Sequence, residues 1–550
     1  MLDIITDFRQ IQRCAHFIGF PGVPKTLQPA EPVRIGVLGA SQVATYAAIW
    51  PSRHIPAVEI AAVAARDRRR AKEFAQRFSI PESYGSYDEL LENPDIDAVY
   101  IGLPNGLHGQ WARKALKAGK HVLCEKPFGA NQHEAAEVHA LARQAGLLCR
   151  EAFHFREHPL AARLRELVLG KPQPGLSASS SPSPLPGWQQ PAASPGGSQG
   201  VLGRLQHLDV QLLIPEWMFG GPQGDNIRFQ DQLAGGAMMD GGCYCISLLR
   251  LLTGAEPHVV SAEASLVPGS QVTDGAMTAQ LAWSDVPGLT ASFTASLQHP
   301  GPVPLTQLKV QGAKGSLECS NFVVPFFGHS IKVCTSEEAA QLSSSPTTPS
   351  HPLPPRPALA LSSTAAGAED ELMGWGRPRG RGVAAAVTQR AEQDVARLRE
   401  WVRGLQGKEG GVQQWVERAY GEQHQTTYFH QLDRFVSDLL VLKTEGAAAD
   451  PIAPSAALQA VRAAQALDES DCLANISLID SVYSAAGLPV RLPTAQYLAL
   501  HGPALPAPAA LAPAAAASAA ASAAASAAAQ WAQSGSAMAA GAQGHSQQAV

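Results

Sequence analysis

Short apolar runs alternate with amphipathic stretches between residues 33 and 150. The apolar runs are rich in Val, Ile, Leu and Ala, which is typical of strands buried on both faces of a parallel sheet. The predicted strands are VRIGVL (33–38), VEIAAVA (58–64), DAVYIG (97–102), HVLC (121–124) and LLCRE (147–151).

Helical periodicity fills the segments between these strands. RRRAKEFAQRF (68–78) and HGQWARKALKAG (108–119) place apolar residues at helical spacing, and Gly119 suits the end of the second helix. Strands that alternate with helices predict an α/β fold with a doubly wound parallel sheet, a Rossmann domain.

The pattern changes at residue 201, after which strand-like runs follow one another with turn residues between them. This predicts a second, α+β domain with a predominantly antiparallel, open-faced sheet. Residues 426–442 (TTYFHQLDRFVSDLLVL) then return to helical spacing, and their apolar residues form one stripe that must pack on another element.

Composition divides the chain further. Segments rich in Ser, Pro, Gly and Ala bury too little apolar surface to offset the entropy of ordering, so we expect them to be flexible. The predicted parts are an N-terminal extension (1–32), the Rossmann domain (33–152), a C-terminal domain (153–335 and 421–497), flexible insertions (172–199 and 336–420) and a disordered Ala-rich tail (498–550).

Charge and cysteine content exclude several classes of protein. With 550 residues, 45% of them hydrophobic, and a net charge of -5, the chain shows no general attraction to nucleic acid or anionic membranes. The eight cysteines lack CxxC pairs and metal-ligand spacing, which predicts reduced core thiols and no metal site. No apolar run reaches membrane-spanning length, and no signal peptide is recognisable, so a cytoplasmic protein is expected.

A glycine-containing turn follows the first predicted strand, in the sequence GVLGASQVA (36–44). A dinucleotide pyrophosphate needs small residues here, because it approaches the backbone N–H groups at the start of a helix. The residues expected at the cofactor are Gly39, Ser41, Gln42 and Val43. Ser41 stands where the fingerprint has its second glycine, so a purely structural glycine turn remains an alternative at this point.

The second predicted strand ends in Ala65-Arg66, where an enzyme that uses NAD would offer a carboxylate to the adenosine ribose. A 2′-phosphate needs positive charge and a planar fork of donors, so Arg66 favours NADP. The alternative is that this arginine run is only the solvated start of a helix, which is the preferred interpretation for Arg69 and Arg70.

Glu125-Lys126-Pro127 follows the HVLC strand and therefore lies at the carboxyl edge of the sheet, where open α/β sheets bind ligands. A lysine at a strand end is usually solvated. Proline restricts the backbone of Lys126, and the peptide bond between them is a candidate for the cis form.

The segments from AAVAARDRRRAKEF through GLPNGLHGQW and HVLCEKPFG to EAFHFREHP resemble the Gfo/Idh/MocA oxidoreductase family, in its dihydrodiol dehydrogenase and NADP-dependent D-xylose dehydrogenase branch. The resemblance implies that Lys126 contacts substrate and nicotinamide. It places Leu103, Asn105 and His108 beside the cofactor.

LAGGAMMDGGCY (233–244) resembles a second motif of this family. Asp240 and Tyr244 are four residues apart, so on a helix they share one face. The resemblance implies that Tyr at position 244, where many inositol dehydrogenases have His, marks the aldose and dihydrodiol branch. The alternative for Tyr244 is a structural tyrosine that anchors a helix in the core.

These residues suggest a mechanism for oxidising an alcohol. Tyr244 is the candidate base, and a nearby Lys126 ammonium would lower its pKa from about 10. Asp240 would orient Lys126 or accept a sugar hydroxyl, and Glu125 would support the cofactor loop. His154 and Arg156, which follow the last strand of the sheet, are expected to line the substrate pocket.

The predicted function is hydride transfer between NADP and a sugar or cyclic diol. The first choice is D-xylose (aldose) 1-dehydrogenase, which forms a lactone, and trans-1,2-dihydrobenzene-1,2-diol dehydrogenase is the alternative. A sugar or dinucleotide sensor without catalysis is a third possibility, which Lys126 and Tyr244 disfavour. The resemblance also implies a homodimer formed through the open face of the second sheet.

Overall fold

The computed structural model describes residues 32–170, 200–219, 226–301, 303–325, 328–335, 413–417, 426–445 and 455–501. The predicted insertion at 172–199, nearly all of the predicted N-terminal extension and most of the predicted tail lie outside this part of the chain. All contacts below belong to the unit that ends at Thr494. A further helix, α15, spans Thr494–His501.

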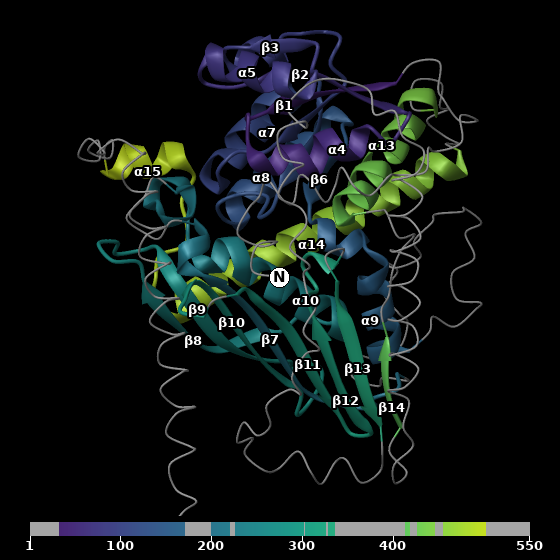
Figure 1. The fold of residues 1–550 in the computed structure, drawn as a ribbon, viewed down its shortest axis with the longest axis vertical. Coiled ribbons are helices and arrows are strands. Elements are labelled where there is room, and N and C mark those ends of the chain that lie inside the picture. Colours follow the sequence, from purple (N-terminus) through teal and green to yellow (C-terminus); the bar gives the residue numbers. More distant parts are fainter. Residues whose placement is uncertain are drawn as a thin grey trace, which may run out of the picture. The chain divides into compact units, whose positions relative to one another are not determined.

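The first sheet is parallel throughout, as predicted (Figure 1). Its strands are β1 (Val33–Leu38), β2 (Val58–Ala64), β3 (Glu82–Tyr84), β4 (Ala98–Ile101), β5 (His121–Glu125) and β6 (Cys149–Ala152). The strand order β3-β2-β1-β4-β5-β6 is that of a Rossmann domain, in which the order reverses between β1 and β4. The loops after β1 and β4 therefore meet at one carboxyl edge.

Capping residues set the ends of the helices around this sheet. Asp67 accepts hydrogen bonds from the first turn of the helix that follows β2, and Asn131 does the same after β5. Gly119 and Gly146 have positive φ angles of 76° and 66° just beyond two helix ends. The helical segments are α3 (Gln42–Ala44), η2 (Thr45–Ile49), α4 (Trp50–Ser52), α5 (Arg68–Phe78), α6 (Tyr87–Leu91), η3 (Asn105–Leu107), α7 (His108–Lys117), α8 (Gln132–Ala145), η4 (His154–Glu157) and α9 (Pro159–Leu169).

The second sheet has eight strands in the order β14-β13-β12-β11-β7-β10-β9-β8. They are β7 (Leu205–Pro215), β8 (His258–Leu266), β9 (Asp274–Ala282), β10 (Thr290–His299), β11 (Leu305–Gly312), β12 (Gly315–Ser320), β13 (Ser330–Thr335) and β14 (Gln413–Glu417). Only β7 and β10 pair in parallel, so the predicted predominantly antiparallel sheet is confirmed.

Strand β14 corrects one predicted boundary. It lies inside 336–420, which was expected to be a flexible insertion, yet its backbone pairs with β13 from Ile331–Glu417 to Thr335–Gln413. The insertion therefore returns to the sheet before it ends, and it adds an edge strand there.

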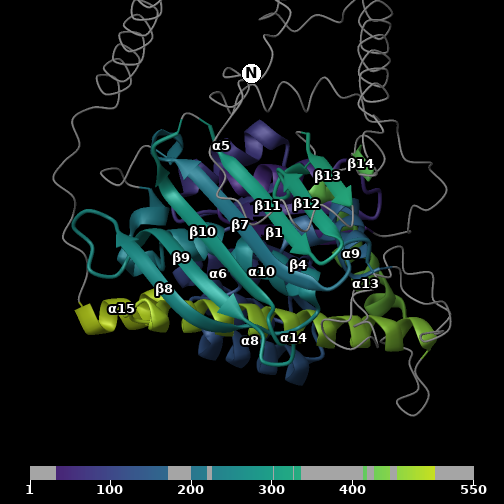
Figure 2. The same ribbon diagram turned by 90° about the horizontal axis from the view of Figure 1, so that it is seen from below.

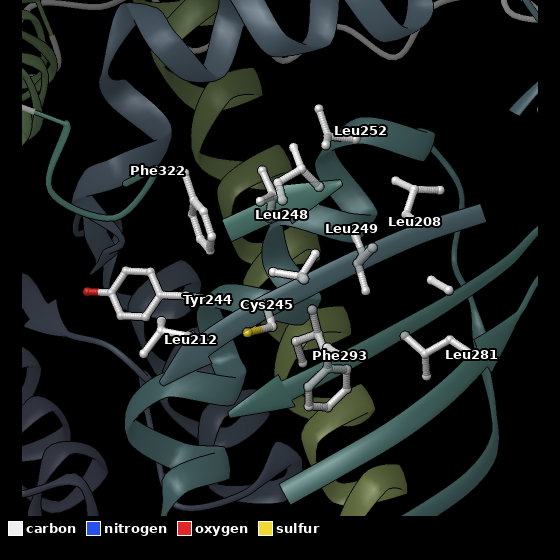
Figure 3. Close-up of a cluster of buried hydrophobic side chains, with 14 of the residues drawn as sticks. Leu208, Leu212, Tyr244, Cys245, Leu248, Leu249, Leu252, Leu281, Phe293 and Phe322 are labelled. Atoms are coloured by element: carbon white, nitrogen blue, oxygen red, sulfur yellow. The ribbon is translucent and has the colours of Figure 1, made fainter. Parts of the chain in front are cut away.

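One face of the second sheet carries the core, and the other is free of helices in the described residues (Figures 1 and 2). Leu208, Leu281 and Phe293 pack against Leu248 and Leu252 on the covered face (Figure 3). The helical segments of this half are η5 (Glu216–Phe219), η6 (Ile227–Phe229), η7 (Asp231–Leu233), η8 (Met238–Gly242) and α10 (Cys243–Thr253). The expected homodimer through the open face stays a prediction.

Two helices near the C-terminal end pack into the cores of the two domains. Leu432, Phe435 and Leu439 of α13 (Thr427–Glu445) belong to the core of the parallel sheet, so this helix completes the Rossmann half. Helix α14 (Ala456–Ala485) places Ile476 in one core and Val482 in another, and it runs between the two sheets (Figure 1). Residues 421–497, which were assigned to the C-terminal domain, therefore also contribute to the core of the Rossmann domain.

Candidate active site

The turn after β1 packs closely against the loop after β4 at Gly39. Gly39 has a φ of +106°, and a Cβ there would lie 2.8 Å from the carbonyl oxygen of Gly102. Ser41 caps the helical run that begins at Gln42, and its Oγ accepts the amide of Ala44 at 3.3 Å. The amides of Gln42 and Val43 have no acceptor within that helix, so they are free to meet an anion.

The residues at the end of β2 suit the 2′-phosphate of NADP better than the two adenosine ribose hydroxyl groups of NAD. Asp67 is the nearest carboxylate, but its Oδ1 accepts the amides of Arg69 and Arg70 at 2.8 and 3.2 Å. These hydrogen bonds lower the pKa of Asp67. Arg66 is exposed, and no carboxylate among the described residues pairs with it. Arg70 is not simply solvated as expected, because its Nη2 donates to the carbonyl of Ala40 at 3.0 Å.

His108 and Asn105 hold loops together instead of presenting side chains to a ligand. His108 is fully buried, with its ring nitrogens 2.7 Å from the carbonyl oxygen of Leu103 and 2.8 Å from that of Pro127. The Asn105 amide donates to the carbonyl of Ala234 at 3.0 Å. A direct cofactor contact by the His108 side chain, as predicted, does not fit this burial. The residue instead joins the loops after β4 and β5.

The Lys126 ammonium lies at the centre of the site. The Lys126–Pro127 peptide bond is cis, and Nζ donates to the carbonyl and the Oδ1 of Asp240 at 2.9 and 3.0 Å. Arg228 donates through Nε to the other Asp240 oxygen at 2.7 Å. The side chains of Lys126, Asp240 and Arg228 remain 11%, 17% and 33% exposed, so a substrate can reach this cluster.

All three of these groups are charged at neutral pH. Burial alone would raise the pKa of Asp240, but Arg228 and Lys126 outweigh it and hold that pKa far below its usual range. Burial would lower the pKa of Lys126, but the Asp240 carboxylate reverses the direction and raises it. The predicted role of Asp240 in orienting Lys126 agrees with these contacts.

Tyr244 lies at the start of α10, directly after the π-helical turn η8 that carries Asp240. The Lys126 Nζ is 4.8 Å from the centroid of the Tyr244 ring, so one ammonium contacts both residues of the second motif. The Tyr244 hydroxyl points away from the apolar cluster that holds the ring (Figure 3). Its oxygen is 2.8 Å from the Nε2 of His154.

The predicted lowering of the Tyr244 pKa is wrong. Burial raises this pKa well above 10, and the negative charges of Glu125 and Asp240 act in the same direction. The Lys126 ammonium, 4.8 Å from the ring centroid, does not reverse this direction. Tyr244 is therefore a neutral phenol at pH 7, a proton donor that needs an acceptor of its own.

His154 and Arg156 do not line an open pocket as predicted. His154 is 1% exposed and lies behind Tyr244. Arg156 forms an ion pair with Asp471 of α14, and its Nε donates to the Ser247 hydroxyl at 2.7 Å. Both residues connect η4 to neighbouring helices, because η4 turns inward after β6 instead of facing the carboxyl edge.

Several residues near the site were not predicted. Arg228 was missed because it lies in a short irregular segment with no periodic signal. Thr427 was missed because it is far along the chain, although its Oγ1 is 2.8 Å from the Nδ1 of His154. The rings of Tyr46 and Tyr428 are 5.2 Å apart, and both hydroxyls lie in the field of Glu125.

Two buried carboxyl groups, those of Glu125 and Glu151, lie near Lys126. Glu125 accepts the Tyr100 hydroxyl at 2.7 Å, and Glu151 accepts the amide of Phe128 at 2.9 Å. Burial raises the pKa of each to about 7, against the pull of neighbouring donors and cations. Glu125 thus has a structural role beside the site, as expected.

Replacing Glu151 by glutamine is expected to stabilise the protein at pH 8 by about 1–3 kcal/mol and to change little at pH 4. In the unfolded chain a glutamate ionises near pH 4.3, whereas folded Glu151 holds its proton to about pH 7. Wild-type stability from this group therefore falls as pH rises from about 4 to 7, and then stays constant.

Urea denaturation at both pH values measures this effect. Exposed Glu73→Gln serves as the control, with a change under about 0.5 kcal/mol at either pH. Equal stability changes for Glu151→Gln at pH 4 and pH 8 would contradict the buried, protonated state.

Among the described residues, no cluster of His, Cys, Asp and Glu side chains is suited to hold a metal ion. No helix in this part of the chain is long and apolar enough to cross a membrane.

Comparison with known proteins agrees with this arrangement. Residues 33–153 match a model described as an oxidoreductase family with an NAD-binding Rossmann fold, and residues 198–318 match the GFO/IDH/MocA C-terminal domain.

Three characterised relatives cover different reactions. A dTDP-3,4-didehydro-2,6-dideoxy-alpha-D-glucose 3-reductase of Actinomadura kijaniata is 32% identical over 49% of this chain and 70% of its own length. A D-xylose 1-dehydrogenase (NADP(+)) of Haloferax volcanii is 37% identical over 41% and 58%. A trans-1,2-dihydrobenzene-1,2-diol dehydrogenase of Mus musculus is 30% identical over 53% and 76%.

The fold also resembles solved structures. A crystal structure of a 3-ketoreductase from Actinomadura kijaniata with NADP and TDP-benzene superposes with a TM-score of 0.53 at 22% identity. The match covers 83% of this chain and 98% of that one. At this identity the likeness supports the fold alone.

Proposed function

Because this chain belongs to the Gfo/Idh/MocA oxidoreductase family, we propose that it transfers a hydride between NADP and a hydroxyl-bearing carbon of a sugar or cyclic diol. Oxidation of D-xylose at carbon 1, which forms a lactone, is the proposed reaction. The observation that carries the proposal is the Lys126 ammonium, which contacts both Asp240 and the Tyr244 ring at the carboxyl end of β5.

The first domain fits the cofactor NADP. Gly39 allows the tight turn after β1, with a φ of +106°, and the amides of Gln42 and Val43 that follow are available to the pyrophosphate. Arg66 is free to meet a 2′-phosphate, while Asp67 is occupied as a helix cap. When bound, NADP supplies the nicotinamide that accepts or donates the hydride.

The residues of the chain supply the charge and the proton. Asp240 holds the Lys126 ammonium at the site, where it stabilises negative charge that develops on the substrate oxygen. The neutral Tyr244 hydroxyl donates a proton to that oxygen during reduction and receives it during oxidation. Arg228 is the further donor for substrate hydroxyls, since its side chain stays 33% exposed.

Two of the relatives are named for other substrates. The mouse dihydrodiol dehydrogenase matches over 76% of its length, and the ketosugar reductase matches over 70%. Both reactions need the same proton donor and the same ammonium. A sensor without catalysis would not require the Lys126–Asp240 pair, and we therefore rank it last.

An assay of NADPH formation tests the proposal. Purified protein with NADP is expected to oxidise D-xylose, and parallel reactions contain NAD, D-glucose or a trans-dihydrodiol. Reduction of a dTDP-linked ketosugar with NADPH tests the third substrate class. No turnover on any of these substrates, despite NADP binding seen by fluorescence, would contradict the proposed activity.

Replacing Arg66 by alanine is expected to raise the KM for NADP by about tenfold or more, because charge-assisted hydrogen bonds to the 2′-phosphate are lost. The KM for NAD should stay within about twofold. Arg69→Ala is the matched control, since this neighbour is exposed and pairs with Glu73. An unchanged KM for NADP in Arg66→Ala would remove this residue from the phosphate site.

A further inference from the structure

The neutral state of Tyr244 raises the question of where its proton goes during oxidation. A phenol that receives the substrate's proton must release its own. The Tyr244 oxygen lies 2.8 Å from the Nε2 of His154, and both side chains are nearly buried, with exposed fractions of 6% and 1%. We propose, on the basis of the proposed function, that His154 is a positioning residue. It accepts the proton of the Tyr244 hydroxyl while Tyr244 accepts the proton of the substrate hydroxyl.

The proposal requires one of the two tautomers that are compatible with the contacts of His154. Its Nδ1 is 2.8 Å from the Oγ1 of Thr427, the first residue of α13. A neutral imidazole has one donor nitrogen and one acceptor nitrogen. With Nδ1–H donating to Thr427, Nε2 is left to accept the Tyr244 hydroxyl.

Packing holds the imidazole in this orientation. The His154 ring stacks on the ring of Tyr428, with centroids 4.0 Å apart and an interplanar angle of 29°. The Tyr244 ring meets it at 63° with centroids 5.7 Å apart. Rotation of the imidazole would break the hydrogen bonds at both ring nitrogens.

The charges around His154 keep it neutral before the reaction. Burial lowers its pKa well below its usual value, and the Lys126 ammonium acts in the same direction. His158 also faces this ring, but it is neutral because burial lowers its own pKa to about 3. Tyr244 and Tyr428 face it as neutral hydroxyls. Hydride transfer removes the positive charge of the nicotinamide ring, so a proton gained by His154 leaves the total charge of the site unchanged.

Two protons and one hydride move in this step. The C–H bond of the substrate breaks and its hydride passes to the cofactor, while the O–H bond breaks and its proton passes to the Tyr244 oxygen. The O–H bond of Tyr244 breaks, and that proton forms the N–H bond at Nε2. The substrate carbon and oxygen form a carbonyl. After the product leaves, the proton returns through Tyr244 to solvent.

Nitrogen NMR of histidine in the full chain tests this arrangement without any substrate. The His154 signals are assigned from their loss in His154→Gln. We expect a protonated Nδ1 and an unprotonated Nε2, and we expect the Nε2 signal to shift in Tyr244→Phe, which removes its donor. A protonated Nε2 in the wild type at pH 7 would overturn the proposal.

Chemical rescue tests the proton transfer itself. His154→Ala is expected to lose about 10²-fold in kcat with unchanged NADP binding, and added imidazole should restore part of it. The restored rate should depend on the pKa of the imidazole derivative, which a structural role would not produce. His329→Ala removes another buried histidine and should show no response to imidazole.

If His154→Ala folds poorly, the conservative variant His154→Gln provides a second test of the proposal. His154→Gln retains hydrogen-bonding groups but cannot hold the proton, so wild-type kcat in this variant would overturn the proposal. If the wild type itself turns over no substrate, the proposed function fails, whereas the NMR result still decides which nitrogen of His154 faces Tyr244.

Discussion

Replacing Lys126 by methionine is expected to lower kcat for D-xylose oxidation by about 10²–10³-fold, with a small change in NADP affinity. Methionine keeps much of the length of the side chain and removes the ammonium. The variant therefore loses the positive charge that contacts Asp240 at 3.0 Å and faces the Tyr244 ring.

A second effect of this variant acts in the same direction. Asp240 loses one of its two cations and keeps only Arg228, at 2.7 Å. A carboxylate that is compensated by one cation instead of two opposes the negative charge that develops on the reacting oxygen. Steady-state kinetics with NADP in excess measure both effects together as a loss of kcat.

A surface lysine provides the matched control. Lys114 pairs with Asp88 at 2.7 Å, with side chains 42% and 56% exposed, so Lys114→Met should leave kcat within about twofold. If Lys126→Met and Lys114→Met both keep a kcat within a few-fold of the wild type, Lys126 has no part in the reaction.

The parallel sheet could be predicted from the sequence because strands buried on both faces are continuous apolar runs. The bounds of β1 and β2 and of α5 agree with the predicted ranges. Strand β3 was missed, since its residues Glu82–Tyr84 are all only half-buried and carry no apolar run. A strand at a sheet edge gives little hydrophobic signal.

Long-range packing could not be predicted in the same way. The apolar stripe of α13 showed that the helix has a buried face but could not show which sheet covers it. Pairing of β14 with β13 joins Glu417 to Ile331 across the second insertion. Such contacts depend on the path of the intervening chain, which local periodicity does not contain.

In the active site, too, the sequence motifs identified some residues, whereas other properties depend on long-range packing. The family resemblance pointed to Lys126, Asp240 and Tyr244, and the structure places the Lys126 ammonium against both of the other side chains. The direction of the Tyr244 pKa shift depends instead on burial, which outweighs the nearby Lys126 ammonium. These are properties of the packed structure, and His154 and Thr427 became relevant only through it.

Replacing Asp274 by asparagine is expected to lower the free energy of unfolding by about 3–5 kcal/mol. Asp274 is fully buried and accepts Arg491 at 2.9 Å, the Tyr483 hydroxyl at 2.9 Å and the Met238 amide at 2.6 Å. The neutral amide leaves the Arg491 guanidinium, 3% exposed, without a compensating charge.

A double variant distinguishes an uncompensated charge from general damage to the core. Adding Arg491→Met to Asp274→Asn removes the second charge, and we expect the pair to recover at least half of the lost stability. Asp88→Asn, at a solvent-exposed ion pair, should cost less than about 0.5 kcal/mol. Urea denaturation of the wild type, these three variants and Arg491→Met alone measures these differences, and strictly additive losses would contradict the buried pair.

The same carboxylate also links stability to the position of the active site. Asp274 accepts the amide of Met238, the first residue of the turn that carries Asp240. The backbone carbonyl of Arg491 accepts the side-chain amide of Asn131, which caps α8 just after the Lys126 loop. Asp274→Asn should therefore reduce kcat even under conditions where the protein is folded, because it loosens both segments that bring Lys126 to Asp240. An unchanged kcat in the folded variant would show that this buried pair stabilises the fold without positioning the site.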